Sequence, residues 1–329
     1  MPGSVTSVFS ESEDFEDALR RDGCRGLVIT DSGQFRARLT QITLHRLRLL
    51  AAEEQLSRIA FIEIPTDIVV TAFPIDNGTP VSGGTRLQLH EIMILSPGEQ
   101  LHLRTDGPRR WGAIWFPAEE LAQYGGAMVG APFVVPTTTH WRPPGGAARR
   151  LRGLHAAAIR IAATRPQTIL NTDAARALEQ QLIDAMVDCL SGGSAVEDTR
   201  YEHRNREILA RFERLVQRGH GPLAPMPETC ATLGISERLL RSLCTQRLGL
   251  SPTGYDRRRR MSLARRALRL GVEGTTNVSE VARHFGFRDL GRFAISYRTA
   301  FGEPPFATLR RGSGATLSGF GPPQRLRHE

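Results

Sequence analysis

The chain has 329 residues, of which 40% are hydrophobic and 23% charged, and its formal net charge is +9. This length predicts about two domains, and the apolar share is sufficient for buried cores, which argues against a disordered chain. No apolar run approaches the roughly 18 residues of a membrane-spanning helix, and the polar, acidic first residues do not resemble a secretory signal. Four scattered cysteines exclude a disulfide framework or a paired-cysteine metal site. We therefore expect a protein of the reducing cytoplasm that makes no membrane contact.

Short apolar runs separated by turn residues extend over residues 35–133. Such runs occupy 58–64, 68–73 and 91–95, and Gly- or Pro-containing turns follow at 96–98 and 106–108. Many short strands with regular turns predict a small β barrel or sandwich.

A barrel of this kind raises the question of a metal or ligand site. Metal-binding cupin barrels need a His-x-His pair with a following Glu and a further His, whereas the polar candidates here are dispersed: His45, His90, Glu91, His102 and His140. We expect no metal, no cofactor and no catalytic residue, since nucleophile, P-loop and dinucleotide signatures are also missing. One further group fits either a ligand mouth or a solvated turn: Arg104, Arg109, Arg110 and Trp111.

The hydrophobic period changes at about residue 147. Apolar residues recur at helical spacing on both sides of Arg165-Pro166, which predicts a pair of amphipathic helices over about 147–190. The pair could cover the barrel, form a dimer contact, or do both. Residues 191–203 are linker-like in composition.

Charge is divided unevenly along the chain. Residues 201–329 hold 23 arginines and 11 acids, whereas residues 1–200 hold 20 arginines and 23 acids. A genome-wide preference for arginine would affect both parts equally, so the asymmetry favours one nucleic-acid-binding domain and one domain with another role. A solvated basic surface without a partner is the alternative.

The basic part contains two similar segments. Gly234 and Gly286 are 52 positions apart, and 53 positions separate Ser236 from Asp289 and Leu240 from Phe293. Each copy predicts a short helix, a turn at the glycine, and a second helix that begins after a capping Ser or Asp. This is the helix-turn-helix arrangement, whose second helix enters the major groove of DNA.

The first recognition helix places polar groups opposite its apolar stripe. We expect Arg238, Arg241 and Ser242 to read bases and Thr245 to contact phosphate, because arginine can donate two hydrogen bonds to guanine. For each arginine the alternative is a phosphate contact or a solvated charge.

The second recognition helix is poorer in hydrogen-bonding groups. Leu290, Gly291 and Ile295 are expected to approach bases through apolar contact, while Arg292 and Arg298 hold phosphates. A helix over 255–268 should fix the separation of the two copies, with Arg257 and Arg258 among its phosphate contacts.

Residues 204–311 resemble the AraC/XylS family of bacterial transcriptional regulators. The resemblance rests on the two copies, the arginine-rich helix, the Leu-Gly-Leu-Ser-Pro run at 248–252 and the segment 301–305, while Pro225 and Thr229 depart from the family pattern. The run at 290–294 also resembles members that carry an arabinose-binding-like, cupin-type β domain. The implied fold class is α+β multidomain, with a cupin-like barrel and helix pair at 1–190, a linker at 191–203, an all-α DNA-binding domain at 204–311 and a disordered tail at 312–329.

The resemblance implies a sequence-specific regulator, often an activator and usually a homodimer, that binds double-stranded DNA. It further implies a possible small-molecule effector and contact with RNA polymerase. A metal cupin enzyme fused to a DNA-binding module is the alternative, and a β domain that only dimerises is a third possibility.

Overall fold

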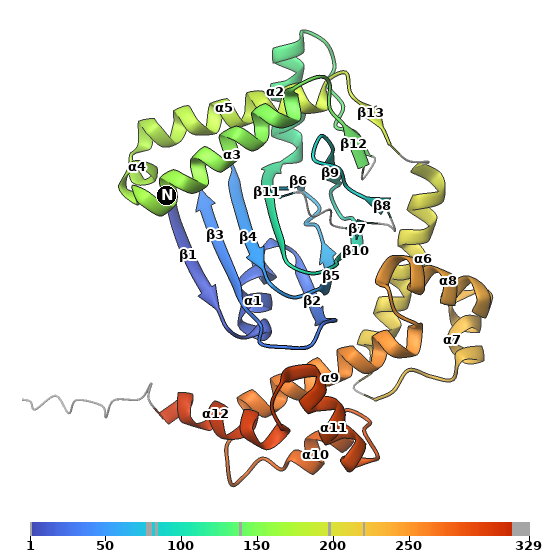
Figure 1. Ribbon diagram of the computed structural model, residues 1–329. Coiled ribbons are helices and arrows are strands. Elements are labelled where there is room, and N and C mark those ends of the chain that lie inside the picture. Colours follow the sequence, from blue (N-terminus) through green and yellow to red (C-terminus); the bar gives the residue numbers. More distant parts are fainter. Residues whose placement is uncertain are drawn as a thin grey trace, which may run out of the picture.

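The computed structural model describes residues 2–76, 81–82, 85–137, 140–196, 199–219 and 221–317. A strand-rich N-terminal domain lies above a helical C-terminal domain (Figure 1). The strands are β1 Gly3–Phe9, β2 Cys24–Ile29, β3 Ala37–Thr43, β4 Arg48–Glu54, β5 Arg58–Glu63, β6 Ile68–Pro74, β7 Val81–Ser82, β8 Thr85–Arg86, β9 Ile92–Leu95, β10 Gln100–Thr105, β11 Arg109–Pro117, β12 His140–Arg142 and β13 Ser194–Ala195. The helices are α1 Ser12–Leu19, α2 Ala118–Val129, α3 Ala147–Thr164, α4 Pro166–Leu170, α5 Thr172–Leu190, α6 Thr199–Gln217, α7 Met226–Leu233, α8 Glu237–Leu248, α9 Pro252–Leu270, α10 Val278–His284, α11 Leu290–Phe301 and α12 Pro305–Leu317, with a 3-10 turn at Arg20–Asp22.

The N-terminal domain is built from two antiparallel sheets. One has the strand order β1-β3-β4-β11-β6-β9-β12-β13 and the other β2-β5-β10-β7-β8. Apolar side chains fill the space between the sheets, for example Leu39 and Leu50 of the large sheet against Leu27 and Ala60 of the small one. Because the middle of the large sheet is covered on both faces, strands β6 and β9 are mostly apolar on both sides rather than alternating.

Helices α3 and α5 cover the outer face of the large sheet (Figure 1). Leu151 and Ala158 of α3, with Leu182 and Met186 of α5, belong to one buried cluster with strand residues such as Leu49. The helix pair therefore has the covering role, and the sequence prediction of an α+β protein with a β domain, a helix pair and an all-α C-terminal domain is confirmed.

The boundaries of the β region differ from those expected. Strands begin at Gly3 rather than near residue 35, α1 lies between β1 and β2, and α2 occupies 118–129 inside the expected β segment. Strand β1 pairs with β3 along its length, from Gly3 opposite Thr43 to Phe9 opposite Ala37. That pairing is non-local, and the polar sequence of β1 gave no alternating apolar signal for it.

Two further segments depart from the expected organisation. The linker region contains β13, which pairs with β12, and α6 begins at Thr199. Helix α12 continues to Leu317, and Gly312 lies so close to the Arg269 carbonyl that a Cβ there would collide with it. The glycine that suggested a tail thus permits two helices to approach closely. The rest of the expected tail, residues 318–329, lies outside the described residues.

Candidate nucleic-acid interface

The first helix-turn-helix unit consists of α7 and α8. Gly234 ends α7 with φ of 67°, in the left-handed region that glycine adopts without strain, and Ile235 N–H donates to the Cys230 carbonyl. The Ser236 hydroxyl accepts from Leu239 N–H at 3.3 Å and caps α8. Leu240 is fully buried in a cluster with residues of α6 and α7, which fixes the rotation of α8.

The second unit consists of α10 and α11 and uses the same local devices. Gly286 has φ of 76° and lies against Pro222, so a side chain would not fit there. The Asp289 carboxylate accepts from Arg292 N–H at 2.9 Å at the start of α11. Phe293 is buried with its ring centroid 4.9 Å from that of Phe287.

The outward face of α8 carries the predicted polar residues. Arg238, Arg241, Ser242 and Thr245 are all exposed. Arg241 forms an ion pair with Glu237 one turn earlier, at 2.6 Å, and the two side chains are about half exposed. An exposed ion pair of this kind stabilises the folded protein by at most about 1 kcal/mol, so the Arg241 guanidinium remains available to a base or a phosphate.

The outward face of α11 is less polar, as the sequence predicted. Gly291, Arg292 and Arg298 are exposed, Ile295 is 70% exposed, and Leu290 is half-buried. The exposed Ile295 side chain is accessible for the apolar base contact that the sequence predicted. Sequence reasoning did not single out two exposed polar side chains of the recognition helices, Gln246 and Thr299.

The predicted phosphate contacts of α9 point in different directions. Arg257 is exposed and donates to Ser296 of α11 at 2.9 Å, which ties α9 to the second recognition helix. Arg258 instead points toward the N-terminal domain, where it approaches the Ile29 carbonyl at 3.5 Å. Arg257 and Arg258 thus lie on different faces of α9, although they are neighbours in the chain.

A buried polar network joins the two domains, and sequence reasoning missed it. Glu213 of α6 accepts from the Tyr255 hydroxyl at 2.7 Å and lies 3.0 Å from His102 Nε2 of β10. Burial alone would raise the pKa of Glu213, but its hydrogen bonds and the nearby Arg259 charge outweigh burial and lower it. These three residues come from elements far apart in the sequence, so no local pattern could have indicated the network.

The candidate metal ligands of the β domain do not converge. His102 belongs to the domain interface, His140 is buried on β12, and His45 and His90 are exposed. Across the residues that the structure describes, no group of three His, Cys, Asp or Glu side chains could hold a metal ion. The helices in those ranges also include none with the length and apolarity needed to cross a bilayer.

A small cavity of about 80 Å³ lies between the two sheets of the β domain. Its wall is almost entirely apolar and includes Ile62, Met93 and Trp115. The two charged residues at the wall already have partners, since Arg58 is paired with Glu54 and Asp22 with Arg48. Of the predicted ligand-mouth residues, only Trp111 is among the residues that line this cavity. Arg104 donates a hydrogen bond to Asp106, while the start of β11 holds Arg109 and Arg110.

Comparison with known proteins identifies the helical domain. Residues 229–311 match a family described as "Helix-turn-helix domain". The chain is similar to the XylDLEGF operon transcriptional activator of Pseudomonas putida, with 37% identity over 114 residues that cover 32% of this chain and 36% of the relative. The helix-turn-helix domain of this chain is thus similar to that of AraC/XylS-type regulators.

Other known proteins are similar to parts of this chain of different extent. The probable thc operon regulatory protein of Rhodococcus erythropolis is 30% identical over 150 residues, or 43% of this chain and 45% of the relative. The solved AraC-like transcriptional activator CuxR is 15% identical, covers 79% of this chain and 94% of its own, and superimposes with a TM-score of 0.41. A probable AraC family regulator from Rhodopseudomonas palustris is 30% identical over 32% of this chain and 97% of its own, with a TM-score of 0.30. The matched part of this chain spans less than half the length of the curated relatives named above.

Proposed function

We propose that the protein is a transcriptional regulator that binds specific double-stranded DNA sequences through α8 and α11. The observation that carries this proposal is the pair of helix-turn-helix units, each with a buried apolar stripe and an exposed opposite face. Arg238 and Arg241 of the first unit can donate to guanine, with about 1–3 kcal/mol of discrimination for each bidentate contact. The named relatives are operon activators and regulators, which supports activation as the direction of control.

Sequence selection of random duplexes by the purified chain tests the proposal. We expect an enriched operator, with specific binding at least about a thousandfold tighter than binding to random duplexes. Arg238→Ala and Arg241→Ala should weaken operator binding more than random binding, whereas Arg292→Ala should weaken both equally. Equal losses from all three variants would remove the base-reading role of α8.

The cavity between the sheets favours an uncharged effector over a charged one, and its volume of about 80 Å³ admits only a very small molecule. Its wall offers apolar side chains, and Arg58 and Asp22 are already paired, so a charged ligand would lose its hydration without gaining a counter-ion. Xenon, a small apolar probe, should raise the unfolding temperature, whereas acetate should not. Ala113→Val, which narrows the cavity, should abolish the shift with xenon. A shift with acetate alone would contradict this assignment.

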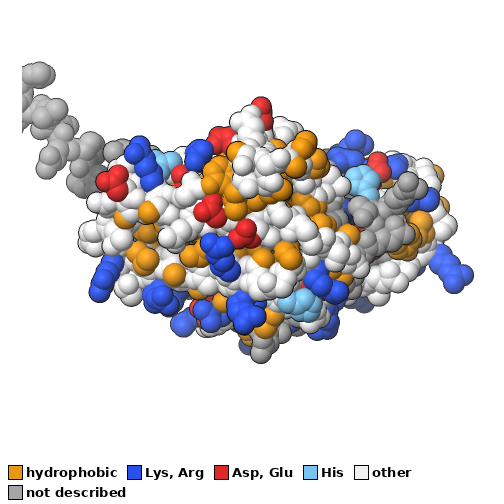
Figure 2. Space-filling view, turned by 90° about the horizontal axis from the view of Figure 1, so that it is seen from above, with side chains coloured by type: hydrophobic (Ala, Val, Ile, Leu, Met, Phe, Trp, Pro, Cys, Tyr) orange, Lys and Arg blue, Asp and Glu red, His pale blue; other side chains and the backbone are white. Residues whose placement is uncertain are grey.

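We further propose that the protein is a homodimer that contacts RNA polymerase. It would act in the cytoplasm of a bacterial cell, at the nucleoid. Figure 2 shows apolar side chains gathered around the central projection of the face seen from above. Large apolar side chains remain exposed at the end of α2, namely Met128 and Val129, which supports a contact with a second copy through this helix. Sedimentation of the chain at several concentrations tests the dimer. The metal-enzyme alternative is not favoured, because the matched relatives are regulators.

A further inference from the structure

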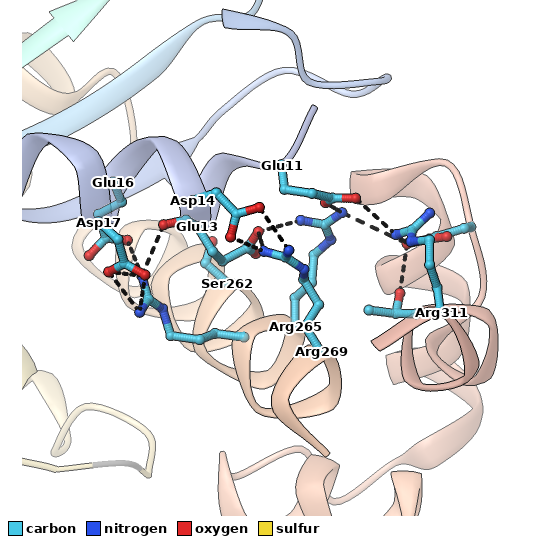
Figure 3. Close-up of polar contacts among 12 residues, drawn as sticks. Glu11, Glu13, Asp14, Glu16, Asp17, Ser262, Arg265, Arg269 and Arg311 are labelled. Atoms are coloured by element: carbon cyan, nitrogen blue, oxygen red, sulfur yellow. Dashed lines mark hydrogen bonds and ion pairs between the residues drawn. The ribbon is translucent and has the colours of Figure 1, made fainter. Parts of the chain in front are cut away.

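The N-terminal helix α1 is packed against the DNA-binding domain by a dense set of ion pairs. Carboxylates of residues 11–17 face arginines of α9 and α12 that lie about 250 to 300 positions later in the chain (Figure 3). The carboxylates are Glu11, Glu13, Asp14, Glu16 and Asp17, and the arginines are Arg265, Arg266, Arg269 and Arg311. We call this contact the α1 clamp.

The geometry of the α1 clamp imitates recognition of a phosphate backbone. The Arg269 guanidinium donates to both oxygens of Asp14, at 3.1 and 2.9 Å, and Arg266 donates to both oxygens of Asp17. Two-pronged donation of this kind is the way arginine binds carboxylate and phosphate alike. The carboxylates therefore occupy the groups with which this face of α9 would otherwise hold an anionic chain.

The occupied face includes a residue for which a DNA role was predicted. Arg258, Arg265 and Arg269 recur at spacings of seven and four residues, so they form one stripe along α9. The whole stripe is turned toward the N-terminal domain, at Ile29 for Arg258 and at Glu13 for the other two. A phosphate role for this stripe requires that the N-terminal domain release it.

The two halves of the DNA-binding domain are held to the N-terminal domain by contacts of different strength. Val28 and Ile59 of the β domain share a buried core with Phe212 and Tyr255 near the first helix-turn-helix unit. The α1 clamp, which holds the second half, has a buried centre, where the Arg265 and Glu13 side chains are each 7% exposed, and an outer part where the Asp14 side chain is 53% exposed. The outer ion pairs contribute little individually and are screened by salt, so a competing polyanion can displace them more readily than the buried core.

We propose that the arginine face of α9 and α12 is a masked binding surface for the DNA backbone, and that the carboxylates of α1 compete for it in cis. This inference rests on the proposed DNA-binding function and adds a second surface to it. The masked surface contacts phosphate without reading sequence, so its release strengthens binding to any duplex.

Neutralisation of the outer carboxylates tests the proposal. The variant Asp14→Asn, Glu16→Gln, Asp17→Asn should bind a random 30-base-pair duplex roughly tenfold more tightly at 0.1 M salt. The slope of its plot of log affinity against log salt concentration should steepen by about one to two, since each additional phosphate contact adds about 0.9 to that slope.

A control variant removes the same charge elsewhere on the N-terminal domain. Glu53→Gln, Glu119→Gln, Asp173→Asn neutralises three exposed carboxylates that have no contact with α9 or α12 in the described residues. It should raise affinity only slightly and leave the salt slope unchanged. Equal affinities and slopes for the two triple variants would overturn the proposal.

Arginine variants complete a thermodynamic cycle. Arg266→Ala, Arg269→Ala should change random-duplex affinity little in the native chain and should cancel the gain in the α1 triple variant. If the triple variant lost its cooperative unfolding transition, the α1 clamp would be structural only, and the proposal would be overturned.

A heparin column separates failure of this inference from failure of the proposed function. Retention on heparin reports exposed arginines whether or not α8 and α11 read DNA, and the triple variant should elute at higher salt than its control. A native chain that selects no operator would refute the proposed function. Normal operator selection with unchanged heparin retention would refute the masked surface alone.

Discussion

Removal of the Glu213 carboxylate tests whether the two domains are stabilised through the buried network. In Glu213→Ala the Tyr255 hydroxyl and the His102 ring lose their shared partner at sites that are at most 6% exposed. Each buried polar group left without a partner costs about 1–3 kcal/mol, so we expect a loss of about 3–5 kcal/mol in the free energy of unfolding.

Urea unfolding followed by two signals measures this loss. The three tryptophans, Trp111, Trp115 and Trp141, all lie in the N-terminal domain, whereas circular dichroism at 222 nm weights the helices. Because Val28 and Ile59 share a core with the first helix-turn-helix unit, both signals should shift together in one transition.

Two matched variants serve as controls for Glu213→Ala. Glu207→Ala, on the exposed face of the same helix, should change stability by no more than about 0.5 kcal/mol. Glu213→Gln retains an acceptor for Tyr255 and should cost less than Glu213→Ala. Since its partners lower the pKa of Glu213, the carboxylate stabilises the fold at neutral pH and this contribution declines as the solution is acidified through that pKa. The reasoning is refuted if Glu213→Ala costs under about 1 kcal/mol, or if only the helical signal shifts.

Three further predictions concern single residues. Burial lowers the pKa of His155 to about 4, against about 6.5 in the unfolded chain. The unfolded chain therefore takes up the proton first, and acidification across this interval should lower the free energy of unfolding by up to about 3 kcal/mol. His155→Gln should flatten the pH dependence of the unfolding temperature, and an unchanged profile would contradict the assignment. Ser236→Ala and Asp289→Ala each remove a helix cap and should cost about 1 kcal/mol in thermal unfolding, while a cost near zero would show that the cap hydrogen bond is matched by water. Leu240→Ala, at a fully buried position, should cost about 2–5 kcal/mol and weaken operator binding, and full operator affinity would mean that α8 is positioned by other contacts.

Short-range patterns in the sequence were sufficient for the DNA-binding elements. The spacing of Gly234 and Gly286, the following cap residues and the apolar stripes at Leu240 and Phe293 specify the local geometry of each unit. These signals lie within about a dozen residues of one another, and helix ends obey local rules of capping and glycine conformation. The same reasoning indicated which face of α8 stays exposed.

Only the tertiary structure decided which arginines of α9 face the N-terminal domain and which face solvent. The arginines of α9 lie on more than one face of the helix, so periodicity could not separate Arg257 from Arg258. The acidic run at 11–17 likewise gave no indication of its partner. The strand role of residues 3–9 and the contact of Glu213 with His102 were equally hidden. Each of these features depends on two segments that are distant in the chain, and their proximity follows from how the sheets and helices pack as whole elements rather than from any local preference.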